Sequence, residues 1–153
     1  MSNFRTESDS MGELQVPADA LYQAQTQRAV NNFAISGLTM PKQFITALAY
    51  IKQAAAQSNF ELNHLSKSKA TAIEQACQQI IDGEHYEHFP VDIFQTGSGT
   101  SSNMNANEVI ATLATRIGNE SIHPNDDVNM GQSSNDVVPT AIALSSAINV
   151  VYE

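Results

Sequence analysis

Two short segments of this chain place glycine, hydroxyl and amide groups just before predicted helices. Glycine lets a backbone approach a ligand closely, and the free N–H groups at a helix N-terminus favour an anion. Such segments could hold carboxylates with neutral donors alone. The candidate donors, all within residues 96–103 and 132–136, are Ser98, Gly99, Thr100, Ser133, Ser134 and Asn135.

Each segment also has an ordinary structural interpretation. Runs of serine, threonine and glycine before a helix are more often turns and caps than ligand sites. Ser133 or Ser134 would suit the N-cap position of the last helix. Two such segments in one chain nevertheless favour a shared anion site, because a dicarboxylate has two ends to hold.

Histidines stand in two further polar segments. One segment consists of His123, Pro124, Asn125 and Asp126. Its histidine could titrate near neutrality, but too few ligands accompany it for a metal, so we predict a turn with an Asx motif. His85 and His88 also lack an obvious third ligand, and we predict solvated loop histidines and no metal site.

The composition argues against highly charged partners. The chain has 153 residues, a net charge of −9 and only seven lysines and arginines, without a basic cluster. We therefore expect neither nucleic acid nor an anionic membrane as a partner. The single cysteine, Cys77, lies in an apolar helical pattern and is expected to be a buried hydrophobe. Neither a signal peptide nor a membrane-spanning run is visible, and we expect a cytoplasmic protein.

The apolar spacing predicts a mainly α-helical fold. An extended arm should cover residues 1–17, and a short strand or extended segment residues 91–94. We place the domain boundary in the loop 118–129, which gives a mixed N-terminal domain, 1–129, and the start of a helical domain, 130–153. The predicted helices cover residues 17–32, a segment opened by Pro41, residues 69–82, residues 102–117 and a segment that begins near Ser133.

The last predicted helix carries an apolar seam suited to near-parallel helix packing. Its members recur at spacings of four and three, and they are Val137, Ala141, Leu144, Ile148 and Val151. The sequence ends at Glu153 without a capping signal, so we expect the polypeptide to continue into a longer helical bundle. The alternative is a terminal helix that packs on its own domain.

Together these segments resemble the class II fumarases of the fumarase/aspartase superfamily. The similar stretches run in order along the chain, at residues 16–22, 25–33, 96–111, 122–129 and 132–136. Two positions favour the fumarase branch, because aspartases tend to carry alanine where Ser98 stands and to lack a histidine at position 123.

The resemblance implies a fumarase/aspartase-like fold and a homotetramer whose active sites each draw on three subunits. It implies that the six candidate donors named above bind the dicarboxylate substrate. A second dicarboxylate site would lie at His123, Pro124, Asn125 and Asp126. Related sequences often carry a basic residue before this turn, whereas this chain has Glu120 there, which would repel a dicarboxylate. Neither a metal nor an organic cofactor is implied.

The implied reaction is the reversible hydration of fumarate to (S)-malate in the tricarboxylic acid cycle. The family's later histidine, and its mobile loop with the serine proposed as the base, lie beyond residue 153. We therefore expect no catalytic base or acid within the chain and no activity from it alone. The alternatives are an aspartate ammonia-lyase of the same superfamily and a non-enzymatic helical module that binds anions.

Overall fold

The computed structural model describes residues 3–152 and confirms a mainly α-helical fold. A two-stranded antiparallel hairpin comes first, and helices of 9 to 20 residues follow. The elements are β1 (Phe4–Asp9), β2 (Gly12–Pro17), α1 (Ala24–Asn32), α2 (Lys42–Glu61), α3 (Lys67–Ile81), the 3-10 turn η1 (Tyr86–His88), α4 (Thr100–Gly118), the π-helical turn η2 (Pro124–Val128) and α5 (Ser134–Tyr152).

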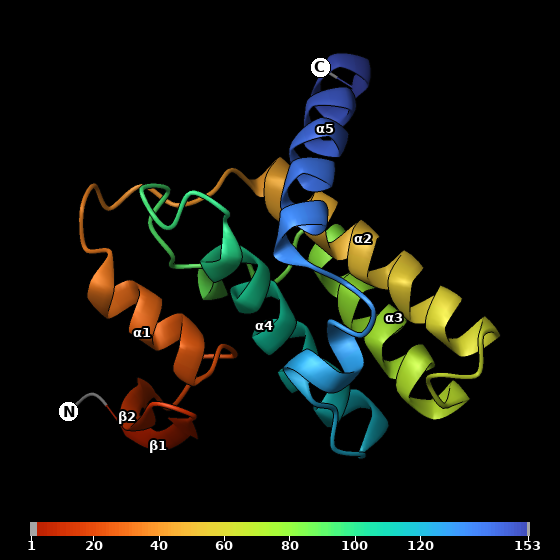
Figure 1. Cartoon of the computed structure of the whole chain (residues 1–153), viewed down its shortest axis with the longest axis horizontal. Helices are drawn as coiled ribbons and strands as arrows, with labels where there is room; N and C mark the ends of the chain where they lie inside the picture. Colours follow the sequence, from red (N-terminus) through yellow and green to blue (C-terminus); the bar gives the residue numbers. More distant parts are fainter. Residues whose placement is uncertain (1–2, 153) are drawn as a thin grey trace.

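Helix α4 lies at the centre of the molecule (Figure 1). The hairpin and α1 lie on one side of it, and α2 and α3 pack together on the other. Helix α5 starts beside α4, runs along α2 and projects beyond the rest of the molecule at its C-terminal end. Within residues 3–152, we find no helix with the length and apolarity that a membrane crossing requires.

The central position of α4 buries polar as well as apolar side chains. Val109, Ile110 and Ala111 are fully buried, as expected for a core helix. The polar residues Ser102, Asn103, Asn105, Asn107 and Glu108 are at most 5% exposed on the same helix. Ala106, Ile110 and Leu113 lie at helical spacing on one face and are buried, whereas Ile117, on the same face in the last turn, is 36% exposed.

The first helix starts later than predicted because Arg5 holds the preceding segment in an irregular conformation. Its guanidinium donates to the carbonyl oxygens of Pro17, Ala18, Ala20 and Tyr22, at 2.7 to 3.2 Å. The four carbonyls converge on one guanidinium, whereas the carbonyls of a regular helix all point along its axis; the Pro17 carbonyl also accepts from the Ala20 N–H at 3.1 Å. Pro17 therefore ends β2, where it pairs with Phe4, instead of opening a helix.

Glu108 caps the N-terminus of α1 from within α4. Its carboxylate accepts hydrogen bonds from the backbone N–H groups of Gln23, Gln25 and Thr26, at 2.8 to 3.1 Å. Burial raises the pKa of Glu108, while these N–H donors oppose that shift. An anion at a helix N-terminus is favourable, so this contact fixes α1 against α4.

Helices α2 and α3 pack against each other, and the apolar pattern around Cys77 is buried as expected. Pro41 precedes α2, and Ile73, Ala76, Cys77 and Ile80 on α3 are fully buried. Burial raises the pKa of the Cys77 thiol, which is therefore the neutral buried group that was expected. Gly83 follows α3 with a φ of 99°, a conformation that suits glycine after a helix.

Of the strand or extended segment predicted at residues 91–94, the structure forms one isolated bridge, between Asp92 and Thr39. The Asp92 carboxylate instead accepts hydrogen bonds from Phe94, Ser36 and Gly37. Burial opposes its ionisation, but these backbone donors outweigh burial and lower the pKa of Asp92 to about 2. This carboxylate ties the loop after α1 to the segment that leads into α4.

The apolar seam of α5 is covered only in its first half. Val137 and Ala141 are buried, whereas Val151 is 70% exposed. Leu144 and Ile148 line an open groove with residues of α2. The helix continues through Pro139, which the sequence prediction had not considered.

Removing the Glu108 carboxylate tests its role as a cap. Glu108→Ala leaves three N–H donors, of which that of Thr26 is buried, without their acceptor, and we expect it to lower the free energy of unfolding by about 3 kcal/mol. Urea denaturation of the 153-residue chain measures this. The control Glu120→Ala, which removes only a hydrogen bond to Ser68, should change it by less than about 0.5 kcal/mol. Equal effects of the two substitutions would contradict the cap.

The open end of the seam predicts self-association of the isolated chain, because exposed apolar stripes attract partners. Truncating a buried Leu or Ile costs roughly 2–5 kcal/mol, so Leu144→Ala combined with Ile148→Ala should shift the chain toward monomer in analytical ultracentrifugation. A wild-type chain that sediments as a sharp monomer at high concentration would contradict this expectation.

Candidate functional site

The first candidate segment forms the N-terminus of α4. Gly99 precedes the helix with a φ of 68° and contributes no side-chain cap. Gln95 supports the first turn, since its Oε1 accepts from the Ser102 N–H at 2.9 Å and its Nε2 donates to the Ser102 Oγ at 2.8 Å. The exposed hydroxyls of Ser98 and Thr100 form a hydrogen bond of 2.9 Å with each other. The segment thus presents hydroxyl groups to solvent at an open helix end.

The second candidate segment forms the N-terminus of α5. Ser133 is the N-cap, because its Oγ accepts from the Asn135 N–H at 3.3 Å and its carbonyl accepts from Val137 at 2.9 Å. This settles the choice between Ser133 and Ser134 that the sequence left open. Asn135 is exposed and Ser134 is half-buried. Neutral donors again surround a helix N-terminus.

The structure brings these two helix N-termini together. Asn103, in the first turn of α4, donates from its Nδ2 to the Oγ of Ser134 at 3.1 Å. A Cβ added at Gly99 would lie 2.8 Å from a methyl carbon of Val138 on α5. The two segments that carry the six sequence-predicted donors therefore lie next to each other, and two positive helix ends with several neutral donors could hold an anion there.

Sequence analysis missed Lys52, a buried polar residue near the N-terminus of α5. Lys52 on α2 is fully buried, and its Nζ donates to the side-chain oxygens of Asn129 at 2.9 Å and Gln132 at 2.8 Å. A signal was present in the sequence. Lys52 lies one helical turn after Leu48 and directly follows Ile51, so it shares the apolar face of its helix.

The His123 segment lies apart as a tightly bonded turn. The imidazole Nδ1 accepts from the N–H groups of Asn125 at 3.3 Å and Asp126 at 3.1 Å. Asp127 accepts from the His123 N–H at 2.8 Å and pairs with Lys69 at 2.9 Å. The predicted turn is therefore present, but the imidazole caps it where we had expected an Asx side chain.

Glu120 is bonded to α3 and not to the turn. Its Oε2 accepts from the hydroxyl of Ser68 on α3 at 2.8 Å. The hollow beside the turn has a volume of about 460 Å³, and its lining includes His123, Arg5 and Arg116 but not Glu120. The acidic residue that precedes the turn thus faces a different part of the surface.

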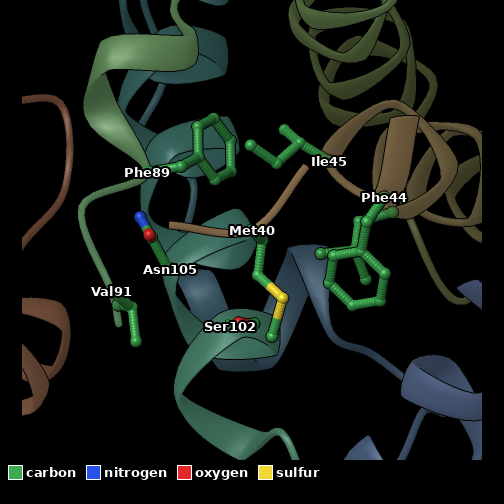
Figure 2. A pocket seen from close by; sticks show the side chains of 8 residues that line it. Met40, Phe44, Ile45, Phe89, Val91, Ser102 and Asn105 are labelled. Atoms are coloured by element: carbon green, nitrogen blue, oxygen red, sulfur yellow. The ribbon is translucent and has the colours of Figure 1, made fainter. Parts of the chain in front are cut away.

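An interior cavity lies between α2, α4 and the segment before α4 (Figure 2). Its volume is about 10 Å³, which is room for one water molecule. Its two polar side chains already have partners, since Ser102 bonds to Gln95 and Asn105 donates to the His88 carbonyl. The cavity is therefore a packing defect and not a substrate site. The labelled side chains are Met40, Phe44, Ile45, Phe89, Val91, Ser102 and Asn105, and Leu48 completes the lining.

His85 and His88 are more enclosed than predicted. His85 bonds to Gln79 at 3.0 Å, and the His88 Nδ1 accepts from the Leu21 N–H at 3.4 Å. Burial lowers the pKa of His88 and favours its neutral form. Ligand atoms of His85, Glu87 and His88 lie within 4.8 Å of one another. Because the His88 Nδ1 accepts a hydrogen bond, its proton is on Nε2, the nitrogen that faces Glu87.

Comparison with known proteins places this architecture in a family. The sequence model of the family described as lyase matches residues 12–151. The chain belongs to this lyase family. The chain is 62% identical over 153 residues to the class II fumarate hydratase of Xylella fastidiosa (strain 9a5c) and covers 32% of that protein. It is 56% identical to a second class II fumarate hydratase, from Pseudomonas aeruginosa, and covers 33% of it.

Solved structures of the lyase family share the fold. The chain superposes on a class II fumarase from Schistosoma mansoni with a TM-score of 0.95 and 43% identity. It superposes on a fumarate lyase:delta crystallin from Brucella melitensis with a TM-score of 0.92 and 49% identity. The superposition on the Schistosoma mansoni fumarase includes 99% of this chain and 33% of the fumarase. The superposition on the Brucella melitensis protein includes 95% of this chain and 36% of that protein. The chain thus spans about a third of the length of its relatives.

The close approach of Gly99 to α5 predicts that this lyase segment does not tolerate a side chain there. Gly99→Ala places a methyl group in a left-handed conformation and against Val138. We expect it to lower the free energy of unfolding by roughly 2–5 kcal/mol. Gly97→Ala is the matched control, because a Cβ there has no atom within 4 Å. Comparable thermal melting of the two variants would contradict the tight contact.

Proposed function

We propose that this chain forms part of a class II fumarate hydratase that interconverts fumarate and (S)-malate in the tricarboxylic acid cycle. The observation that carries the proposal is the meeting of two donor-rich helix N-termini, which Asn103 joins to Ser134 at 3.1 Å. The 62% identity to a class II fumarate hydratase supports the choice of substrate.

In the proposed site, the two segments hold a dicarboxylate. Ser98, Gly99 and Thr100 supply donors from α4, and the group Ser133, Ser134 and Asn135 supplies them from α5. When malate is dehydrated, a base removes the proton beside a carboxylate, and negative charge accumulates on that carboxylate. Donors fixed in advance stabilise this charge without reorganising. The base and the acid are expected in the two thirds of the relatives' length outside this segment.

The same proposal extends to the assembly. We infer a homotetramer in which the segment 130–153 begins a shared helical bundle and 1–129 forms the N-terminal domain. The exposed apolar positions Val150 (85%) and Val151 (70%) on α5 support it, because a bundle would cover them.

A second dicarboxylate site is proposed at His123, Pro124, Asn125 and Asp126. The nearby hollow is lined by Arg116, whose positive charge suits a dianion, whereas Arg5 in the same lining is already paired with Glu7 at 2.7 Å. The engagement of Glu120 with Ser68 keeps this acid from repelling such a ligand.

An aspartate ammonia-lyase of the same superfamily and a non-enzymatic anion-binding module are the alternatives. The full-length protein should convert malate to fumarate and leave aspartate unchanged, as monitored by the absorbance of fumarate. Release of ammonia from aspartate would favour the ammonia-lyase, and inactivity on both substrates would favour the binding module. The 153-residue chain alone should produce no malate from fumarate above background, and robust production would show that the base lies within it.

Donor removal tests the proposed site. In the full-length enzyme, Thr100→Ala and Asn135→Ala should each lower kcat/KM by roughly ten- to a thousandfold, since each removes a donor to developing charge. Both residues are exposed here, so folding should be little affected. Thr71→Ala, an exposed threonine on α3, is the control and should keep wild-type kinetics. Wild-type kinetics in Thr100→Ala and Asn135→Ala would mean that the segments are helix caps only.

A further inference from the structure

Lys52 is a fully buried lysine whose hydrogen-bond partners are neutral. Its exposed fraction is 0%, and its Nζ donates to Oδ1 of Asn129 and Oε1 of Gln132. Burying an ammonium is costly unless hydrogen bonds or an opposite charge compensate for it. Within residues 3–152 no carboxylate forms an ion pair with Lys52. A charge kept at such a cost indicates a function beyond packing.

The side-chain amides of Asn129 and Gln132, which accept the hydrogen bonds of Lys52, are held in place by backbone groups of their own segment. The Nε2 of Gln132 donates to the carbonyl oxygens of Val128 at 3.0 Å and Met130 at 3.3 Å. The Nδ2 of Asn129 donates to the carbonyl of Gln132 at 3.4 Å. Since the amide nitrogens are engaged with the backbone, the amide oxygens face Lys52. The ammonium thereby closes a network that holds the segment 128–132 in one conformation.

This segment leads directly into the second candidate segment. Residue 132 is followed by Ser133, the N-cap of α5. The Oδ1 of Asn129 accepts from Lys52 and also, at 3.2 Å, from the Nδ2 of Asn103, the group that donates to Ser134. The Oδ1 of Asn103 is buried and has no partner within the described residues. Lys52 is thus connected to the N-termini of both α4 and α5.

We propose that Lys52 is a positioning residue for the dicarboxylate site, which holds the Ser133, Ser134 and Asn135 segment in place through Asn129 and Gln132 and supplies a buried positive charge behind it. This inference rests on the proposed function, because it assigns a dianion to that surface. It deepens the proposal by naming the group that lets an acidic chain, with a net charge of −9, bind a dianion with neutral donors in contact.

The charge of Lys52 should respond to the ligand. Burial lowers the pKa of Lys52 to about 7. The titratable group that faces it is Cys77 on α3, a neutral thiol because burial raises its pKa. The groups that face it from the segment 129–132 are the amides of Asn129 and Gln132. A nearby dianion favours the ammonium, and by reciprocity the ammonium favours the dianion. Lys52 is charged below about pH 7, so affinity for the dicarboxylate should fall as the pH rises above that value.

The test compares two lysine variants on the same helix of the full-length enzyme. Lys52→Met keeps the length of the side chain and removes the charge. Lys42→Met is the control, because Lys42 is exposed and lies over the ring of Tyr86. We expect Lys52→Met to raise KM for malate by roughly five- to a hundredfold, the range of typical coupling between two ligands. The kcat of Lys52→Met should change much less. In the wild type KM should increase as the pH rises above about 7, and in Lys52→Met this increase should be absent. Lys42→Met should match the wild type in both respects.

The outcomes separate this inference from the proposed function. If the wild type hydrates fumarate and Lys52→Met keeps its KM and pH profile, the inference is wrong and the function stands. If the wild type has no hydratase activity, the proposed function is wrong, and hydrogen exchange decides whether Lys52 positions the segment. Faster exchange at residues 129–136 in Lys52→Met than in Lys42→Met supports positioning, and equal exchange overturns it.

A measurement on the wild type covers the case in which Lys52→Met does not fold. Succinate, a saturated four-carbon dicarboxylate, is titrated into the full-length wild type at pH 8, by calorimetry in two buffers of different ionisation enthalpy. Proton uptake on binding supports the inference, and binding without uptake overturns it. Lys52→Gln, which keeps one donor without the charge, should bind succinate without that uptake. Uptake equal to that of the wild type would assign the proton to another group.

Discussion

The burial of polar side chains along α4 is the constraint on which the rest of the structure depends. A buried polar group is costly unless it has a hydrogen-bond partner. Four of these side chains find partners in other parts of the chain, whereas Asn107 bonds to Met104 on the same helix. Glu108 accepts hydrogen bonds from the N-terminus of α1, and Asn105 donates to the carbonyl of His88. Ser102 bonds to Gln95, and Asn103 donates to Asn129 and Ser134. One helix thereby fixes α1, the loop before α4 and the start of α5. Apolar packing alone would not fix these orientations as narrowly, because it is non-directional.

The same constraint shapes the candidate site. Asn103 contributes its backbone to the first turn of α4 and its side chain to Ser134, so the two helix N-termini are placed by a residue that belongs to one of them. The absence of a side chain at Gly99 then allows α5 to approach. A dicarboxylate could meet hydroxyl and amide groups at this surface without a basic side chain in direct contact. The buried ammonium of Lys52 provides a positive charge near these neutral donors, protected from salt screening by its burial.

Part of the apolar surface of α5 is exposed, and the related lyases are longer than this chain. On α5, Val137 and Ala141 are buried, whereas Val150 and Val151 are exposed to solvent. The solved relatives superpose closely on this segment and are about three times its length, since it covers 33% of the Schistosoma mansoni fumarase. The exposed end of α5 fits the proposed helical bundle, which would cover it.

The sequence by itself determined what depends on local chemistry. Helical periodicity located α2 to α5 to within a few residues, because apolar spacing and proline act over one or two turns. The hydroxyl and amide clusters before α4 and α5 were visible for the same reason, and the role of either segment in binding remains a prediction. Only the tertiary structure decided which groups meet. Arg5 delays α1 by binding carbonyls more than ten residues away, Glu108 caps a helix more than 80 residues earlier, and Lys52 joins a segment 77 residues later. Such contacts leave no periodic signal, since they depend on the packing of whole helices and not on the spacing of neighbours along the chain.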